Sequence, residues 1–416
     1  METTMDEKIL GTRIYLARKQ KALTLRELSK KSGLSHTQIY RIEKGTTIAK
    51  PEAITRLMDA LDISFQPEKA YEEAFYKIYH ELFYNVLYVN YETAKKYFES
   101  LYRQRQIYEN CRCFIDYHLI MLMVVVHTGY RKELMDYFFN ACELLEDYLE
   151  DSKREWFQVM KILYLHRQFN HDEALSHADA LLKTINNEHF RGILQYTRGT
   201  ILIADYKHYH DALDAFSEAQ KIFEDNLNFN RSNRAKAVKQ RVYIYLFRFE
   251  DFQTSFKESE TYAKKNGVLD LYYFIHLNQA IYHLFDENYA EALKLLDMFE
   301  LPAASYYMTK TYLCYKLKLD DKALETLNTF RQSGISFVRS LEQRMLELIE
   351  RGIKEGEDDT YLEMLRDFTD DAIAERHFPL IKQGVSLLTT LLEKRRRYKE
   401  AYHYAGTLLS IINTIH

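Results

Sequence analysis

Apolar residues recur every three or four positions along almost the whole chain, which is the spacing of one face of an α-helix. Residues 7–62 divide into four or five short segments of this kind, and longer segments follow from about residue 71 to the end. The 416 residues include only 12 Gly and 4 Pro, which favours helices joined by few tight turns. The pattern therefore predicts an all-α fold with a small N-terminal part and a long helical remainder.

The first segment, residues 7–19, is expected to place its apolar side chains near one face and its basic side chains outside. The apolar set is Ile9, Leu10, Ile14 and Leu16, and the basic set is Arg13, Arg18 and Lys19. The second helix should begin after Thr24, because Glu27 stands three residues later as in a capping box. Gly33 suits the left-handed position that ends it.

A third short helix is predicted over residues 36–43, with Ser35 as its N-cap. Ile39 and Ile42 should point inward, and Gly45 should stop the helix. Pro51 then opens a fourth helix whose apolar positions are Ile54, Leu57, Met58 and Leu61.

The string T-L-R-E-L-S-K-K-S-G-L-S-H-T-Q-I-Y-R-I-E-K-G resembles the helix-turn-helix of the phage-repressor (Xre/Cro) family along its whole length. The resemblance implies that the third helix enters the major groove of duplex DNA by its N-terminal residues. The residues implied to face DNA are Ser35, His36, Thr37, Gln38, Tyr40 and Arg41. Gln38 and Arg41 have the hydrogen-bonding groups suited to adenine and guanine edges.

The same resemblance implies phosphate contacts from Thr24, Arg26, Lys44 and Thr46, which position the domain without reading sequence. Many members of the family carry Gln directly after the cap of the second helix, where this chain has Leu25 and Arg26. Lys30 and Lys31 are expected to be ordinary solvated side chains.

Charge is distributed unevenly along the chain. Residues 1–66 contain twelve Lys and Arg against eight Asp and Glu, a net charge of +4. The whole chain carries 57 against 61, or −4, so the remainder carries −8 (−4 minus +4). A basic N-terminal part suits a polyanion partner, whereas the acidic remainder does not.

From about residue 71 one motif recurs, in which an aromatic or polar residue precedes a small or medium residue by three positions. It reads Tyr91-x-x-Ala94, Tyr130-x-x-Glu133, His171-x-x-Ala174, Tyr209-x-x-Ala212, Phe249-x-x-Phe252, Tyr289-x-x-Ala292, Asp320-x-x-Ala323 and Tyr398-x-x-Ala401. Five of the first six spacings, 39, 41, 38, 40 and 40 residues, are nearly equal, and the last, 78, is close to two periods, with a degenerate copy near residues 358–365. A period near 40 predicts an α-solenoid of eight or nine units.

These motifs resemble the start of the second helix of a tetratricopeptide (TPR) repeat, where a small residue lets two helices approach closely. The predicted fold is thus an Xre/Cro-type helix-turn-helix over residues 1–66 followed by a right-handed TPR-like α-solenoid over residues 67–416. The C-terminal helices are rich in Leu and Ile. They are expected either to cap the array or to form a dimer interface, with no preference between the two.

Other functional classes find little support in the sequence. Cys111, Cys113, Cys142 and Cys314 lack the spacing of a zinc site or a disulfide framework, so they are expected to be buried thiols. The longest apolar run, residues 119–126, is too short to span a bilayer, and residues 1–13 lack the apolar core of a signal peptide. We expect a cytoplasmic protein with no metal, no cofactor and no catalytic residues.

A helix-turn-helix followed by TPR-like repeats resembles the peptide-pheromone regulators of Gram-positive bacteria and their phages, the group that contains Rgg, PlcR, PrgX, NprR and AimR. The resemblance implies a homodimer that binds DNA under the control of a short signalling peptide held in the concave groove of the repeats. The groove-facing residues that it implies are Thr197, Arg198, Arg234, Arg241, Asn278 and Gln279.

Three alternatives remain open at this stage. The repeats could bind a protein partner, such as a response regulator or an antirepressor, in place of a peptide. They could support a Rap-like phosphatase activity, although no catalytic Gln or acid can be assigned. They could also serve only for dimerisation of a phage-type repressor.

Overall fold

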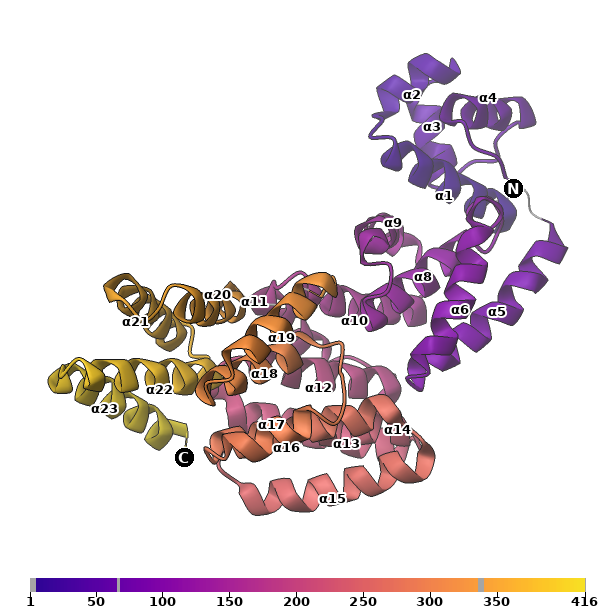
Figure 1. Cartoon of the computed structure of the whole chain (residues 1–416). Helices are drawn as coiled ribbons and strands as arrows, with labels where there is room; N and C mark the ends of the chain where they lie inside the picture. The colour runs from indigo at the N-terminus through magenta and orange to yellow at the C-terminus, as the bar shows by residue number, and fades with distance from the viewer. Residues whose placement is uncertain (1–4, 66–67, 336–339, 416) are drawn as a thin grey trace. The chain divides into compact units, whose positions relative to one another are not determined.

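The computed structural model describes residues 5–65, 68–335 and 340–415, and it divides into two compact units, Met1–Asn186 and Asn187–His416 (Figure 1). Regular structure in the described ranges is helical throughout, so the all-α prediction is confirmed. The predicted domain boundary at residues 66 and 67 lies outside the described residues. No helix within the described ranges is both long enough and apolar enough to cross a membrane.

The helices of the first unit are α1 (Met5–Gln20), α2 (Leu25–Ser32), α3 (His36–Glu43), α4 (Pro51–Leu61), α5 (Lys69–Leu87), α6 (Tyr91–Arg103), α7 (Arg105–Tyr108), α8 (Phe114–Thr128), α9 (Met135–Leu145), α10 (Asp151–Arg167) and α11 (His171–Leu181). Two short 3₁₀ turns, η1 (Lys132–Leu134) and η2 (Glu146–Tyr148), flank α9.

The helices of the second unit are α12 (Glu188–Leu202), α13 (Tyr209–Asp225), α14 (Phe229–Tyr245), α15 (Phe249–Asn266), α16 (Leu269–Phe285), α17 (Tyr289–Leu296), α18 (Ala304–Lys316), α19 (Asp320–Gln332), α20 (Ser340–Lys354), α21 (Asp359–Ala374), α22 (Phe378–Lys394) and α23 (Tyr398–Ile415). A 3₁₀ turn, η3 (Tyr206–His208), precedes α13.

Helices α1 to α4 share one apolar core, as the sequence predicts. Ile14 from α1, Leu28 from α2, Ile39 from α3 and Leu57 from α4 are all fully buried in it. Because each helix contributes only one to three buried apolar side chains, no one of them buries enough surface to be stable alone. The four helices therefore fold as one small bundle.

From α5 onward the described helices pack in nine consecutive pairs, which fits the eight or nine predicted units. The pairs are α5/α6, α8/α9, α10/α11, α12/α13, α14/α15, α16/α17, α18/α19, α20/α21 and α22/α23. The recurring motif begins the second helix of its pair at Tyr91, His171, Tyr209, Phe249, Tyr289, Asp320 and Tyr398. The motif at Tyr130 is an exception, because η1 is inserted there and α9 begins only at Met135.

The small residue of the motif is buried in most of the repeats. Ala94, Ala174, Ala212, Ala292 and Ala323 have no exposed surface. An added methyl group would therefore meet the facing helix instead of solvent.

We expect Ala292→Leu to lower the free energy of unfolding by about 1–3 kcal/mol, because the larger side chain overpacks the α16/α17 interface. Ala290→Leu is the matched control, since Ala290 is exposed on the same helix. Denaturant unfolding followed by circular dichroism measures both. Equal effects of the two substitutions would show that Ala292 is not a close-packing position.

The turns between paired helices differ from the sequence-based expectation. Non-glycine residues adopt the left-handed conformation two positions before the second helix, at Val89, Phe169, Phe247, Glu287, Lys318 and Arg396. This conformation costs an L-residue about 1–2 kcal/mol, which glycine would avoid. The expectation that a low Gly content means few tight turns is therefore wrong. Tight turns are present, and non-glycine residues adopt the left-handed conformation in them.

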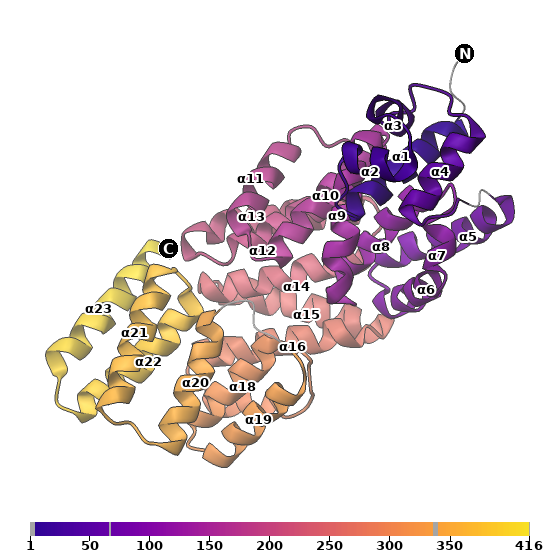
Figure 2. The same cartoon turned by 90° about the horizontal axis from the view of Figure 1, so that it is seen from above.

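The two ends of the second unit contact each other through the turn before α13. Arg376, which follows α21, forms an ion pair with Asp205 at 3.0 Å, and its carbonyl accepts a hydrogen bond from Tyr206 N–H at 3.2 Å. At the end of α23, the carbonyl of Ile415 lies 3.2 Å from His210 Nε2. The last repeats therefore pack back on the first repeat of this unit (Figure 2).

Helix α22 reinforces this closure with an aromatic cluster. The ring of Phe378 lies 6.0 Å from that of Phe247 and 5.9 Å from that of Phe285, at the ends of α14 and α16. Lys382 Nζ donates to the carbonyl of Phe285 at 3.1 Å. We call this set of contacts, together with the Asp205–Arg376 pair, the C-terminal closure.

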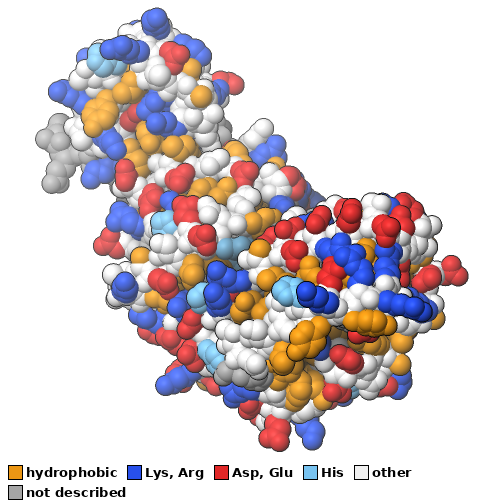
Figure 3. All heavy atoms as spheres, turned by 90° about the vertical axis from the view of Figure 1, so that its left-hand side faces the viewer, with side chains coloured by type: hydrophobic (Ala, Val, Ile, Leu, Met, Phe, Trp, Pro, Cys, Tyr) orange, Lys and Arg blue, Asp and Glu red, His pale blue; other side chains and the backbone are white. Residues whose placement is uncertain are grey.

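The leucines of the C-terminal helices divide between core and surface. Leu387, Leu388, Leu391 and Leu392 of α22 are buried, which is the arrangement expected of a capping repeat. On α23, by contrast, Tyr402 and Leu409 are exposed. Apolar side chains are visible among charged ones on the face that Figure 3 shows, the side on which α21–α23 lie. The dimer interface remains a prediction.

Candidate nucleic-acid interface

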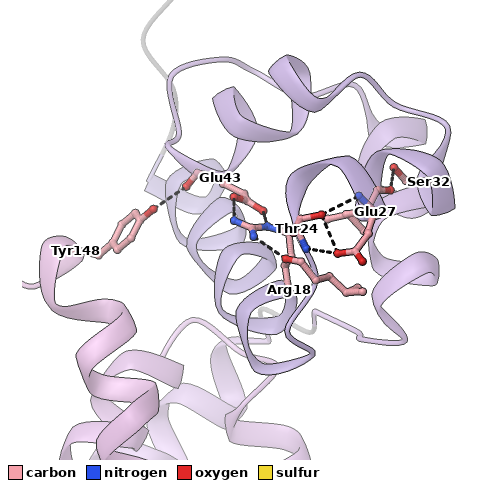
Figure 4. Close-up of polar contacts among 8 residues, drawn as sticks. Arg18, Thr24, Glu27, Ser32, Glu43 and Tyr148 are labelled. Atoms are coloured by element: carbon pink, nitrogen blue, oxygen red, sulfur yellow. Dashed lines mark hydrogen bonds and ion pairs between the residues drawn. The ribbon is translucent and has the colours of Figure 1, made fainter.

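Two capped ends define the turn between α2 and α3. Thr24 Oγ1 accepts from the N–H of Glu27 at 3.2 Å, and the Glu27 carboxylate accepts from the N–H of Thr24 at 2.7 Å, so the predicted capping box is confirmed (Figure 4). Gly33 ends α2 with φ of 71°, and Ser35 Oγ accepts from the N–H of Gln38 at the start of α3. These caps set the angle at which α3 leaves the turn.

Helix α3 is held by its inner face only. Ile39 and Ile42 are buried in the core of the bundle. The six residues predicted to face DNA, Ser35, His36, Thr37, Gln38, Tyr40 and Arg41, are all exposed. Tyr40 is 51% exposed. The outer face of α3 is therefore free to contact another molecule.

A buried ion pair fixes the end of α3 against α1. Arg18 Nε donates to Glu43 Oε1 at 2.6 Å and Arg18 Nη2 donates to Oε2 at 2.8 Å, while Nη1 donates to the carbonyl of Leu23 (Figure 4). Arg18 is 6% exposed and Glu43 is 2% exposed. The hydrogen bonds to Glu43 raise the pKa of Arg18. The pair is bidentate, which restricts both the distance and the orientation of the two helices.

The prediction that Arg13 and Arg18 lie on the solvent-exposed side of the first helix is wrong. Both are buried, because α1 is covered on two sides. Leu10 and Ile14 pack in the bundle core, whereas Ile9 and Leu16 pack with Phe114 of α8 and with α9. The four apolar residues thus occupy two faces and not one. Arg13 and Arg18 lie near the boundaries of these faces and bind polar partners inside the fold.

Close backbone contact between α1 and α3 depends on Gly11. A Cβ atom at this position would overlap the carbonyl oxygen of Ile42. Since that oxygen belongs to the backbone, it cannot move aside as a flexible side chain could. Gly11 therefore allows the approach of the helices that places Arg18 against Glu43.

The helix-turn-helix rests on the first repeats of its own unit. Leu16 packs with Phe114, Ala141 and Leu145. Arg13 Nη2 donates to Asn110 Oδ1 at 3.1 Å. These contacts come from the face of α1 that carries Ile9 and Leu16, whereas the face that carries Leu10 and Ile14 packs in the bundle core.

Tyr148, in η2, is a contact residue that the sequence analysis missed. Its hydroxyl donates to the carbonyl of Glu43 at 3.3 Å, at the end of α3 (Figure 4). The ammonium of Lys44 lies 5.0 Å from the centre of the Tyr148 ring, within the range of a cation–π contact. One tyrosine thus touches both the end of the candidate recognition helix and a predicted phosphate-binding residue.

The four predicted phosphate-binding residues, Thr24, Arg26, Lys44 and Thr46, are all exposed. Two of them also have structural partners. Thr24 forms the capping box, and Thr46 Oγ1 donates to the carbonyl of Arg41 at 3.2 Å. Several Lys and Arg side chains lie on the surface of this small bundle, which is uppermost in Figure 3.

We expect Thr24→Ala to lower the stability of the bundle by about 1 kcal/mol, the usual cost of losing a threonine N-cap. Thr24→Ser should retain most of the stability, because the hydroxyl remains. Thermal unfolding measures both. An alanine variant as stable as the parent would contradict the capping role. In that case, any loss of DNA affinity would be due to the phosphate contact alone.

The six residues predicted to face the groove of the repeats lie on α12, α14 and α16, but they do not share one environment. Thr197 is 2% exposed and Asn278 has no exposed surface. Thr197 Oγ1 donates to Ile193, and Asn278 Nδ2 donates to the carbonyl of Ala237. The expected groove-facing placement is therefore wrong for these two, because Thr197 bonds within its own helix α12 and Asn278 bonds to the neighbouring helix α14.

The other four, Arg198, Arg234, Arg241 and Gln279, are partly exposed. Arg234 forms an ion pair with Asp270. Arg241 Nε donates to Asn278 Oδ1 at 2.8 Å, and its guanidinium stacks on the ring of Phe274 at 4.6 Å. Asn278 therefore positions Arg241 and does not itself face outward.

Arg241 has unused hydrogen-bonding capacity. Its Nη2 is buried and has no hydrogen-bond partner among the residues that the structure describes, and burial lowers the pKa of the guanidinium. Helix α14, which carries it, holds Arg231, Arg234, Lys236, Lys239 and Arg241 and no Asp or Glu. The helix is thus a local concentration of positive charge in an otherwise acidic part of the chain.

Comparison with known proteins gives a family match by sequence for the N-terminal part alone, and matches by fold for most of the chain. Residues 14–67 match the family model described as Helix-turn-helix. A search of curated protein sequences finds no match. The small bundle is therefore a helix-turn-helix domain by sequence as well as by geometry.

Solved structures match the fold over most of the chain. One is a Rap protein complexed with competence and sporulation factor, with a TM-score of 0.64, 14% identity, and coverage of 82% of this chain and 99% of that chain. A second is the Rap conjugation gene regulator of the plasmid pLS20 in complex with the Phr* peptide, with a TM-score of 0.53, 11% identity, and coverage of 82% and 97%. A third is the apo form of the quorum sensor NprR from B. thuringiensis, with a TM-score of 0.50, 14% identity, and coverage of 82% and 99%. The predicted resemblance to this group is confirmed at the level of fold.

Proposed function

We propose that this protein is a sequence-specific DNA-binding transcriptional regulator whose affinity for DNA is controlled by a short peptide bound to its helical repeats. The observation that carries the proposal is the outer face of α3. Six exposed residues lie on this face, while Ile39 and Ile42 hold the opposite face in the core. A short helix anchored in this way can enter a major groove about 12 Å wide.

Within this proposal the ten exposed residues have two roles. Gln38 and Arg41 form hydrogen bonds with adenine and guanine edges, supported by Ser35, His36, Thr37 and Tyr40. Arg26, Lys44, Thr24 and Thr46 contact phosphates on either side of the groove. Residues 1–66 form the DNA-binding domain, and residues 67–416 form the ligand-sensing and dimerisation domain.

The peptide site is proposed on α12, α14 and α16, around Arg241. Asn278 and Phe274 orient the guanidinium of Arg241, but no described residue accepts a hydrogen bond from its Nη2. A carboxylate or a peptide carbonyl would complete its hydrogen bonds. Arg198, Arg234 and Gln279 provide further polar contacts from the same three helices, whereas Thr197 and Asn278 act within the fold. The three solved structures of similar fold include two that are described as complexes with a peptide or factor.

The C-terminal closure offers a way for a peptide to change the shape of the second unit. A ligand held by α14 and α16 lies on the helices whose ends contact Phe378. If the peptide binds one curvature of the repeats more tightly than another, it shifts the population toward that curvature. In a homodimer, this changes the spacing of two DNA-binding domains that must meet grooves about 34 Å apart, or a multiple of that.

Two binding measurements on the full chain test the proposal. Duplexes selected from a random pool should yield a preferred sequence, whose binding is followed by fluorescence anisotropy. A pool of random hexapeptides is then added, and retained peptides are identified by mass spectrometry. We expect a subset to bind the parent chain and the control Arg248→Gln, which alters an exposed ion pair with Asp251, but not Arg241→Gln.

Each measurement can contradict a different part of the proposal. Absence of a preferred duplex would exclude sequence-specific DNA binding. Equal peptide binding by Arg241→Gln and the parent chain would exclude the peptide site. Retention of no peptide, together with specific binding of a response regulator or an antirepressor, would support a protein partner for the repeats instead.

A further inference from the structure

The turn between α7 and α8 brings two cysteines together in the first unit. The Sγ atoms of Cys111 and Cys113 are 2.7 Å apart, and both residues are buried free thiols. A disulfide needs a sulfur–sulfur distance of about 2.05 Å. Less than 1 Å of approach therefore separates the present contact from a covalent bond, on the order expected from small side-chain rotations.

The two thiols differ in acidity. The hydrogen bond with Cys113 lowers the pKa of Cys111, and the same contact raises the pKa of Cys113. Arg112 lies between them and pairs with Glu72 of α5 at 3.3 Å. The directions of these two shifts favour Cys111 as the attacking sulfur, and the 2.7 Å contact places Cys113 to resolve it. Cys142 is also buried, and burial alone raises the pKa of its thiol.

This turn is also adjacent to residues that contact α1. Asn110 accepts the hydrogen bond from Arg13, and Phe114 packs against Leu16. These residues flank the two cysteines directly. A change of backbone conformation between Cys111 and Cys113 would be transmitted to both contacts, because Asn110 directly precedes Cys111 and Phe114 directly follows Cys113.

We propose that Cys111 and Cys113 form a reversible disulfide when the protein meets a peroxide, and that this modification alters the contacts that hold α1. The Cys111 thiolate attacks hydrogen peroxide and becomes a sulfenic acid, with release of hydroxide. The Cys113 sulfur then displaces that hydroxyl group as water, and the S–S bond forms. In total two thiols lose two electrons and two protons, and one peroxide is reduced to two molecules of water. Two molecules of a low-molecular-weight thiol reduce the disulfide back to the two cysteines and are themselves joined in a disulfide.

The covalent step is tested on the folded full chain with dilute hydrogen peroxide, followed by alkylation and tryptic digestion. Trypsin cleaves after Arg112, so Cys111 and Cys113 fall on separate peptides that stay joined only if the disulfide is present. We expect the joined pair after oxidation, and its loss after reduction. Cys142→Ser is the matched control that should retain it, and Cys113→Ser should abolish it. Cys113→Ala serves if the serine variant is not folded.

The effect on DNA rests on the proposed function and is measured separately. We expect the oxidised chain to differ from the reduced chain in affinity for the selected duplex by about fivefold or more, the lower range of a coupling between two sites. The Cys113 variant should show no such difference. Failure to recover the joined peptides from oxidised, folded protein would overturn the modification site. A full yield of disulfide with unchanged DNA affinity would overturn the coupling to α1. Absence of any DNA binding by the reduced chain would instead contradict the proposed function.

Discussion

Replacing Glu43 with alanine should lower the free energy of unfolding of the helix-turn-helix domain by about 3–5 kcal/mol, the usual cost of removing one partner of a buried ion pair. The reason is that Arg18 would remain buried with its charge uncompensated. Its Nε and Nη2 both donate to Glu43, and only Nη1 has another partner, the carbonyl of Leu23. Because the carboxylate is itself 2% exposed, water cannot readily replace it. Denaturant unfolding of the full chain, followed by hydrogen exchange of α1 and α3, measures the loss.

Two variants separate this effect from a general effect of charge. Glu52→Ala removes an exposed carboxylate from α4 of the same domain and should change stability little. Arg18→Met combined with Glu43→Leu removes both charges and should recover most of the stability lost in Glu43→Ala. If Glu43→Ala and Glu52→Ala were equally stable, the pair would not hold α3 in place.

The second large effect concerns DNA binding and not stability. We expect Gln38→Ala combined with Arg41→Ala to weaken binding to the selected duplex by about 10²-fold or more, since each bidentate base contact contributes about 1–3 kcal/mol of discrimination. Both side chains are exposed, so their truncation should leave the unfolding transition unchanged. Fluorescence anisotropy at one fixed salt concentration gives the affinities, because phosphate contacts make them strongly salt-dependent.

Lys30→Ala combined with Lys31→Ala is the matched control for this variant. It removes two positive charges from the last turn of α2, whereas the α3 variant removes one. If charge alone determined binding, the control would have the larger effect. Our account predicts the opposite order, together with a loss of sequence preference only in the Gln38 and Arg41 variant.

The helix-turn-helix was predictable in detail because its signals are local. A capping box, a left-handed Gly33 and the Ser35 cap each act within four residues, so the sequence around them is sufficient to place α2 and α3. The repeats were predictable for a related reason. The small residue of each motif lies at the contact between two consecutive helices, and its spacing is visible as a period.

Contacts between distant parts of the chain were not predictable in the same way. Leu16 and Ile14 both look like core residues, but whether they face one core or two depends on helices more than 90 residues away, as Phe114 shows. The same holds for the groove candidates. Asn278 and Arg241 both lie on the first helix of their pairs, yet one is buried between helices and the other is partly exposed. Position in a repeat therefore predicts which helix carries a polar side chain, but not whether that side chain remains exposed.

The central claim is that the outer face of α3 lies in the major groove of the bound duplex. The most direct measurement is protection of guanine N7, which faces the major groove, from methylation by dimethyl sulfate in the presence of saturating full-length protein. Our account predicts protected guanines in the preferred sequence with the parent chain, and loss of that protection with the Gln38 and Arg41 variant at equal occupancy. Unchanged N7 reactivity on a fully bound duplex would show that the protein binds DNA by another surface, and would contradict the claim.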